Sequence, residues 1–137
     1  MFPLNPVIMD VRGYLDFSGH FYIGCGSTIR VEPQAKLSIG NGSRMGANGL
    51  IFCEDTISIG ENVEMSWNCQ LMDTDRHEIE DITTHQVYPS HVPIHIGDNV
   101  WIGNHVCINK GCAIPDDTIV ASNSLCNKNY SFLPPFF

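Results

Sequence analysis

Four of the six histidines of the chain lie in one stretch, Leu71–Gly97, with the sequence LMDTDRHEIEDITTHQVYPSHVPIHIG. Imidazole can accept a proton near neutral pH or bind a metal, so general-base chemistry and a metal site are both open for this stretch. His85, His91 and His95 follow one another with the spacings H-x5-H and H-x3-H. Such spacings also suit loop and strand-edge positions. We favour that interpretation and expect no metal.

A six-residue repeat surrounds this stretch and fails inside it. Aliphatic residues recur at every sixth position in the list Ile96, Ile102, Ile108, Ile114 and Val120. The same spacing joins Ile39, Met45 and Ile51, and it joins Ile59, Met65 and Leu71. The i, i+3, i+4 spacing of a helix is absent, and Gly, Asn, Asp and Pro recur too often for helices. Six residues instead make a short strand plus a turn, where Gly or Asn adopts the unusual backbone angles at low cost.

Units that begin with Ile-Gly or Ile-Pro indicate the length of one coil. Six hexads separate Ile23 from Ile59, and three hexads separate Ile96 from Ile114, so we expect three hexads in each coil. Three hexads give three flat faces, and the sequence therefore predicts an all-β fold, a triangular parallel β-helix. Its coils would stack about 4.8 Å apart, with Cys69 and Cys112 at small inward positions of the core.

The pattern also predicts the domain boundaries. Ile59 and Ile96 are about two coils apart, which we interpret as one coil that carries an inserted loop of about residues 73–93. A long loop on a rigid repeat is a usual place for function. We expect an N-terminal lead-in at 1–20, the β-helix domain at 21–130 and a C-terminal tail at 131–137.

The composition limits the classes of function. The chain has 137 residues, 43% of them hydrophobic, and a formal net charge of −8. This length suits one domain with a buried core, and an acidic surface disfavours nucleic acid and membranes as main partners. The six cysteines form no CxxC pair, so a zinc or thioredoxin-type site has no support. The apolar start MFPLNPVIMD is a poor signal peptide, and we expect a cytoplasmic protein.

Two segments resemble a known family. The run IHIGDNVWIGNHVCINKGCAIPDDTIVASNSLCNK resembles the hexapeptide-repeat acyltransferases, whose fold is a left-handed parallel β-helix. The segment MDTDRHEI resembles the loop of the maltose, galactoside and polysaccharide O-acetyltransferase branch. The resemblance covers roughly residues 20–128. It implies an O-acetyltransferase that uses acetyl-coenzyme A (acetyl-CoA) and a saccharide hydroxyl, and a homotrimer that binds acetyl-CoA between adjacent β-helices.

By this resemblance His77 is the general base, on a loop that reaches toward the neighbouring subunit. A saccharide hydroxyl is a poor nucleophile at neutral pH, and an imidazole with a pKa of about 6.5 can accept its proton. Holding hydroxyl and thioester together supplies much of the remaining rate. Asp73 or Asp75 would orient His77 and stabilise its imidazolium form. Both also suit solvated loop positions, and the sequence does not choose between the two.

The resemblance also implies binding residues. Those for the coenzyme are Trp101, Asn104, Ser122, Asn127 and Lys128. Trp101 fits a place beside the active site and a subunit interface equally well. Asn104 and Ser122 match positions that contact the pantetheine arm, and Lys128 matches a basic residue near the phosphates, with Asn127 its neighbour. Asn48 and Asp55 match positions near the acceptor, and structural turns suit them as well.

The end of the chain, KNYSFLPPFF, departs from the family pattern, which continues into a GNPAK-like segment. Either the chain is shortened, or the last coil is capped by Phe132, Leu133, Phe136 and Phe137. Three other functions stay open. The shortened end favours an inactive β-helix scaffold, and DRH resembles the serine acetyltransferases, although the first twenty residues are too few for their helical region. The third is a γ-carbonic anhydrase type, which the lack of an H-x4-H pair disfavours.

Overall fold

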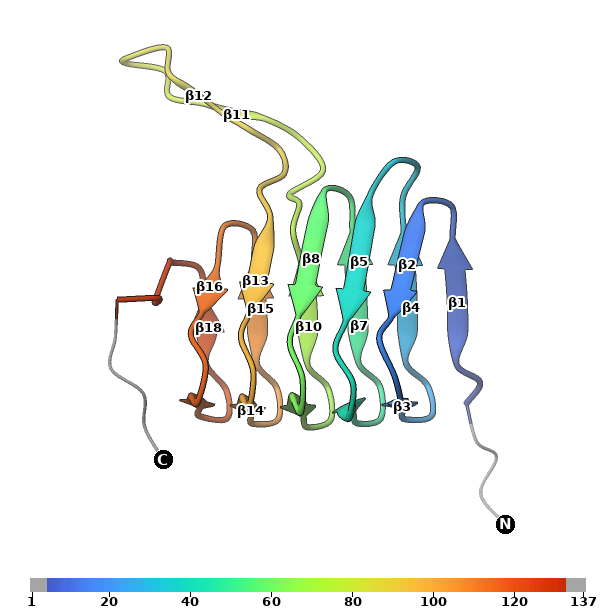
Figure 1. Cartoon of the computed structure of the whole chain (residues 1–137). Coiled ribbons are helices and arrows are strands. Elements are labelled where there is room, and N and C mark those ends of the chain that lie inside the picture. The colour runs from blue at the N-terminus through green and yellow to red at the C-terminus, as the bar shows by residue number, and fades with distance from the viewer. Residues whose placement is uncertain (1–4, 133–137) are drawn as a thin grey trace.

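Three parallel sheets build the part of the chain that the computed structural model describes, residues 5–132. Face A consists of β1 (Ile8–Val11), β4 (Thr28–Val31), β7 (Leu50–Cys53), β10 (Gln70–Met72), β15 (Cys107–Asn109) and β18 (Leu125–Cys126). Face B consists of β2 (Tyr14–Phe17), β5 (Lys36–Ile39), β8 (Thr56–Ile59), β13 (Ile94–Ile96) and β16 (Ala113–Ile114). Face C consists of β3 (Phe21–Ile23), β6 (Ser43–Met45), β9 (Glu64–Met65), β14 (Trp101–Ile102) and β17 (Ile119–Val120). The predicted parallel β-helix is confirmed, and its successive coils stack into a β-solenoid of about six turns (Figure 1).

Columns of aliphatic side chains fill the axis of the solenoid. On face B, Ile39 pairs with Ile59, Ile59 with Ile96 and Ile96 with Ile114. All four are buried, and burying each isoleucine side chain stabilises the fold by about 1.5–3 kcal/mol relative to leaving it exposed.

Within residues 5–132, no helix has the length and the apolar composition that a membrane span requires.

The six-residue spacing holds at two of the three corners of the coil. Between faces B and C it joins Ile59 to Met65, and between faces C and A it joins Met65 to Leu71. Between faces A and B the inward residues are ten apart, eight apart and six apart in the pairs Ile29–Ile39, Ile51–Ile59 and Ile108–Ile114. Extra residues therefore collect at the corner between faces A and B, which we call the loop corner.

The prediction of three hexads in every coil is wrong for the first coils. Ile23 stacks on Met45, more than three hexads further along the chain, whereas Ile59 lies on a different face and stacks on Ile39. The longer turns at the loop corner are the reason. The spacing of three hexads holds at the end of the solenoid, where Ile108 pairs with Cys126.

The boundaries also differ at the N-terminal end. Strands β1 and β2 lie within residues 1–20, the expected lead-in, and pair with β4 and β5, so the first coil begins at Ile8. Ile59 pairs with Ile96, as expected for one coil with an insertion, and residues 73–93 lie between β10 and β13. Phe132 is 79% exposed and caps nothing in the described chain. The other expected capping residues, Leu133, Phe136 and Phe137, lie outside the described residues.

The turns between faces C and A use residues with a left-handed backbone. Asn48, Asn68, His105 and Asn123 have φ between 56° and 61° at this corner of four successive coils. Asparagine adopts this region more easily than most other side chains, which explains its recurrence. His105 therefore sits at a coil corner, and Asn48 has a structural turn position.

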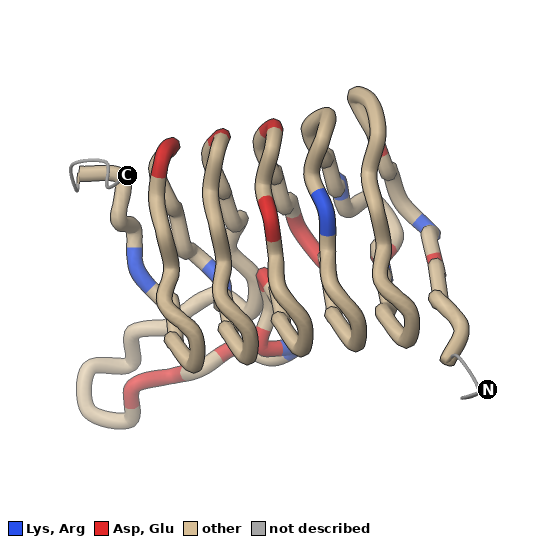
Figure 2. The backbone as a smooth tube through the Cα atoms, turned by 90° about the horizontal axis from the view of Figure 1, so that it is seen from below, with Lys and Arg blue, Asp and Glu red and all other residues tan. Residues whose placement is uncertain are grey.

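Acidic residues recur at the corner between faces B and C, and Figure 2 shows them at the tips of neighbouring coils. Asp116 accepts the backbone N–H of Asp98 at 2.7 Å, and Asp98 accepts that of Glu61 at 2.8 Å. These carboxylates hold the turn of the coil before them. Part of the negative charge of the chain is therefore structural.

Candidate functional site

The insertion leaves the solenoid at the loop corner and returns to it as an antiparallel pair of arms. Thr74 forms a bridge with His91, and the N–H of Asp75 donates to the carbonyl of Ser90 at 2.8 Å. Beyond these contacts the arms continue into a hairpin of β11 (Ile79–Glu80) and β12 (Val87–Tyr88), which projects from the edge of the solenoid (Figure 1). The base of the insertion is therefore fixed to the coils, and its tip is free of them.

His77 lies on the outgoing arm and is exposed. It lines a hollow of about 480 Å³ whose floor is the outer side of face A, with Gln70 and Met72 of β10 and Asn109 of β15. The walls come from the outgoing arm, including Asp75. An imidazole in this position can reach a molecule bound in the hollow.

The two aspartates before His77 are both engaged elsewhere. Asp73 is 0% exposed, and its carboxylate accepts the N–H groups of Glu54 and Asp55, each at 2.8 Å. Burial raises the pKa of Asp73, although both N–H donors favour its ionised form. The carboxylate of Asp75 lies 2.5 Å from the ammonium of Lys110. Asp73 therefore holds the insertion to the preceding coil, at the turn after β7. Asp75 holds it to the following coil, at Lys110 after β15.

A second hollow lies at the loop corner, and we call it the notch. Its lining residues are Glu32, Pro33, Gln34, Lys36, Glu54, Asp55, Thr56 and His91. The turn of Glu54 and Asp55 is shorter than those of the neighbouring coils, which leaves this gap between them. Asp55 lies 2.8 Å from Nδ1 of His91, and this hydrogen bond raises the pKa of His91. Sequence reasoning gave His91 only a loop position, because its partner is 36 residues away.

The residues expected to bind the coenzyme are only partly brought together. Ser122 donates a hydrogen bond to Asn104 across adjacent coils at 2.6 Å, and Trp101 is exposed on face C close by. Asn127 and Lys128 are exposed and directly follow β18, so they lie at the loop corner, whereas Asn104 and Ser122 lie at the corner between faces C and A. The two expected acceptor residues are also apart, because Asn48 precedes β7 and Asp55 follows it.

Two further histidines contact polar side chains, and one cysteine packs in the core. Nδ1 of His85 lies 3.2 Å from Glu80, and Nδ1 of His95 lies 2.6 Å from Ser58. In residues 5–132 no group of three or more His, Cys, Asp or Glu side chains is arranged to hold a metal ion. Cys69 is buried in the core, as predicted, and burial raises the pKa of its thiol.

Sequence comparison finds acetyltransferases among the proteins similar to this chain. Galactoside O-acetyltransferase of Escherichia coli (strain K12) is 34% identical over 119 residues, which span 80% of this chain and 55% of that protein. A putative acetyltransferase of Dictyostelium discoideum is 30% identical over 109 residues, which span 75% of this chain and 57% of that protein. The chain is a homologue of galactoside O-acetyltransferase, and the solved structures that share its fold include a hexapeptide-repeat acetyltransferase. It spans about half the length of the curated relatives that it matches, and no family model matches it.

Solved structures of hexapeptide-repeat proteins share the fold. The polysialic acid O-acetyltransferase OatWY has a TM-score of 0.65 at 24% identity, covering 94% of this chain and 78% of that one. A hexapeptide-repeat acetyltransferase of Vibrio cholerae O1 biovar eltor, complexed with acetyl-coenzyme A, has a TM-score of 0.61 at 24% identity, covering 91% and 64%. The hexapeptide-repeat solenoid is therefore a left-handed β-helix, as predicted. This hand is opposite to the usual right-handed crossover, so the repeat period alone does not predict it.

Proposed function

We propose that this chain transfers the acetyl group of acetyl-CoA to a hydroxyl of a saccharide, with His77 as the general base. The observation that carries the proposal is the position of His77, exposed above the hollow on face A in a homologue of galactoside O-acetyltransferase. The proposal assigns the protein to the cytoplasm, where a reducing environment keeps its six free cysteines as thiols.

The reaction needs one base and no covalent enzyme intermediate. His77 takes the proton of the acceptor hydroxyl while the hydroxyl oxygen attacks the carbonyl carbon of the thioester. The tetrahedral intermediate collapses, the carbon–sulfur bond breaks, and the imidazolium returns the proton to the leaving thiolate. The products are the acetyl ester and free coenzyme A. Backbone N–H groups beside the hollow would stabilise the oxyanion.

The binding residues fit these substrates to different degrees. The paired polar groups of Asn104 and Ser122 suit the amides of the pantetheine arm, beside exposed Trp101. The ammonium of Lys128, with Asn127 next to it, suits the coenzyme phosphates. In the notch, the carboxylate of Asp55 is a suitable acceptor for sugar hydroxyls. The turn position of Asn48 makes it the weaker acceptor-binding candidate.

The hairpin supports a homotrimer with active sites at the subunit interfaces. A two-stranded hairpin is marginally stable when nothing packs on it. This one exposes Ile79, Val87 and Tyr88, and Ile82 at its turn is 90% exposed. Burial of these apolar side chains against a second copy of the chain would stabilise the hairpin and carry the insertion toward the neighbouring subunit.

The test is acetyl transfer from acetyl-CoA to a panel of saccharides, followed through release of the coenzyme thiol. Loss of a general base lowers kcat by about 10²–10⁴-fold, so His77→Ala should do so with the protein still folded. His20→Ala, an exposed histidine of the first coils, is the matched control and should keep wild-type activity. Full transfer by His77→Ala would refute the mechanism. A wild-type trimer that does not bind acetyl-CoA would favour the scaffold function.

A further inference from the structure

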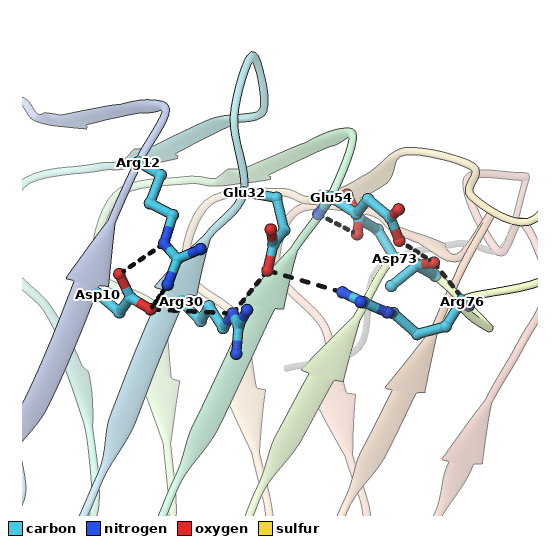
Figure 3. Close-up of polar contacts among 8 residues, drawn as sticks. Asp10, Arg12, Arg30, Glu32, Glu54, Asp73 and Arg76 are labelled. Carbon is cyan, nitrogen blue, oxygen red and sulfur yellow. Dashed lines mark hydrogen bonds and ion pairs between the residues drawn. The ribbon is translucent and has the colours of Figure 1, made fainter.

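Arg76 directly precedes His77, and its side chain lies across the outer side of face A (Figure 3). Its guanidinium lies 5.3 Å from the centre of the Phe52 ring, and one of its nitrogens is 3.6 Å from the carboxylate of Glu32. Phe52 belongs to β7 and Glu32 follows β4, so Arg76 spans two coils that lie before the insertion. The contact combines cation–π attraction with an ion pair, for which the planar guanidinium is well suited.

The partners of Arg76 are themselves held in place. Arg30 pairs with Glu32 at 2.5 Å and lies 5.5 Å from the same Phe52 ring. The side chain of Glu32 is mostly buried. Phe52 therefore lies close to two guanidinium groups, those of Arg30 and Arg76. Both also pair with the carboxylate of Glu32 (Figure 3), so Arg76 docks on an arrangement that the solenoid has already built.

The backbone of Arg76 is strained. Its φ is 68°, in the left-handed region that costs a residue other than Gly about 1–2 kcal/mol. The N–H of Arg76 donates to the hydroxyl of buried Thr74 at 2.8 Å, and that hydroxyl donates to Glu54. Such a conformation persists only where surrounding contacts hold it, and strain of this kind gathers at functional sites. The turn at Arg76 decides the direction in which the chain enters His77.

We propose that Arg76 is a positioning residue for His77. This inference rests on the proposed function of His77. The contacts with Phe52 and Glu32 stabilise the left-handed turn, and the turn points the imidazole into the hollow on face A. Without those contacts the turn relaxes, and the base moves away from the acceptor hydroxyl. A displacement of about 1 Å is enough to lower the rate of such a reaction by about 10²-fold.

The experiment compares Arg76→Ala and Phe52→Leu with Arg12→Ala. Arg12 is the matched control, because it pairs with a carboxylate (Asp10) on the same face and its side chain is 56% exposed, against 53% for Arg76. We expect Arg76→Ala to lower kcat roughly 10- to 100-fold with KM for acetyl-CoA within about twofold. Phe52→Leu should act in the same direction, and Arg12→Ala should leave both constants unchanged.

Hydrogen exchange of the amide at position 76 supplies a second readout, because this N–H donates to Thr74. Its protection should fall in Arg76→Ala and stay at the wild-type level in Arg12→Ala. Wild-type kcat in Arg76→Ala would overturn the positioning role, as would unchanged protection of this amide. A fall in kcat that comes with an equal rise in KM would also overturn it, because it would indicate a binding residue. A wild-type protein that acetylates no acceptor refutes the proposed function instead, and exchange then decides alone whether Arg76 anchors the turn.

Discussion

The substitution Asp73→Asn tests whether this aspartate acts in the chemistry or holds the insertion. Its carboxylate accepts two backbone N–H groups, from Glu54 and Asp55, at 2.8 Å each, in a side chain that is 0% exposed. Asparagine has the same shape but only one acceptor oxygen. Its amide nitrogen would therefore face one of the two N–H donors, and that donor would lose its partner.

The magnitude follows from this one lost partner. A buried N–H without an acceptor costs about 1–3 kcal/mol. Removal of the buried charge offsets part of that cost, because burial raises the pKa of Asp73. We therefore expect a net loss of about 1–2 kcal/mol and a fall in Tm of roughly 4–8 °C for a domain of this size.

The assay combines thermal unfolding, at one protein concentration, with acetyl transfer per folded molecule. Asp16→Asn, an exposed carboxylate on β2, is the control and should keep the wild-type Tm. Asp73→Asn should keep most of its kcat at a temperature where it is folded. An unchanged Tm would refute the structural reasoning. An unchanged Tm with a kcat lowered by 10²-fold or more would show that Asp73 supports His77 directly.

Two further predictions concern the base of the insertion. Asp55→Asn should move the pKa of His91 down toward its ordinary value, measured by NMR titration of the ring, since the bond to Asp55 raises it. Because the pKa of His91 is higher in the folded than in the unfolded protein, the bond stabilises the wild type at pH values below the unfolded pKa. This contribution is lost as the pH rises through the folded pKa. A stability difference between wild type and Asp55→Asn that grew with pH would contradict this assignment. The ammonium of Lys110 contacts Asp75 of the outgoing arm at 2.5 Å and donates to the carbonyl of Pro89 of the returning arm at 2.8 Å. Lys110→Ala removes both of these contacts between the arms and the solenoid. It should raise protease cleavage within the hairpin while Tm falls by only a few degrees, and wild-type resistance to cleavage would count against it.

The fold was largely predictable because its signal is local. An aliphatic residue at every sixth position fills the axis of the solenoid, and the loss of that pattern after Leu71 marks the insertion. The coil length was mispredicted for the first coils. Extra residues at the loop corner change the register between faces A and B, and a count of hexads does not show which corner they occupy.

The site was predictable in its residue types and less so in its contacts. Asn104 and Ser122 are hydrogen-bonded neighbours, because three hexads separate equivalent positions in the last coils. Asp73 and Asp75 were equivalent candidates in the sequence, yet one is buried under the turn of Glu54 and the other pairs with Lys110. Nothing local distinguishes two aspartates that lie so close together in a loop.

The sequence by itself determined the repeating strand and turn, the inward residues and the place where the chain leaves the solenoid, since each depends on the chemistry of a few neighbouring positions. Only the tertiary structure decided which side chains meet at the loop corner, where Asp55 pairs with His91 and Arg76 with Glu32. These partners are far apart in the chain. They become neighbours because stacked coils bring the turns of successive coils within side-chain reach, at distances that depend on the length of each turn.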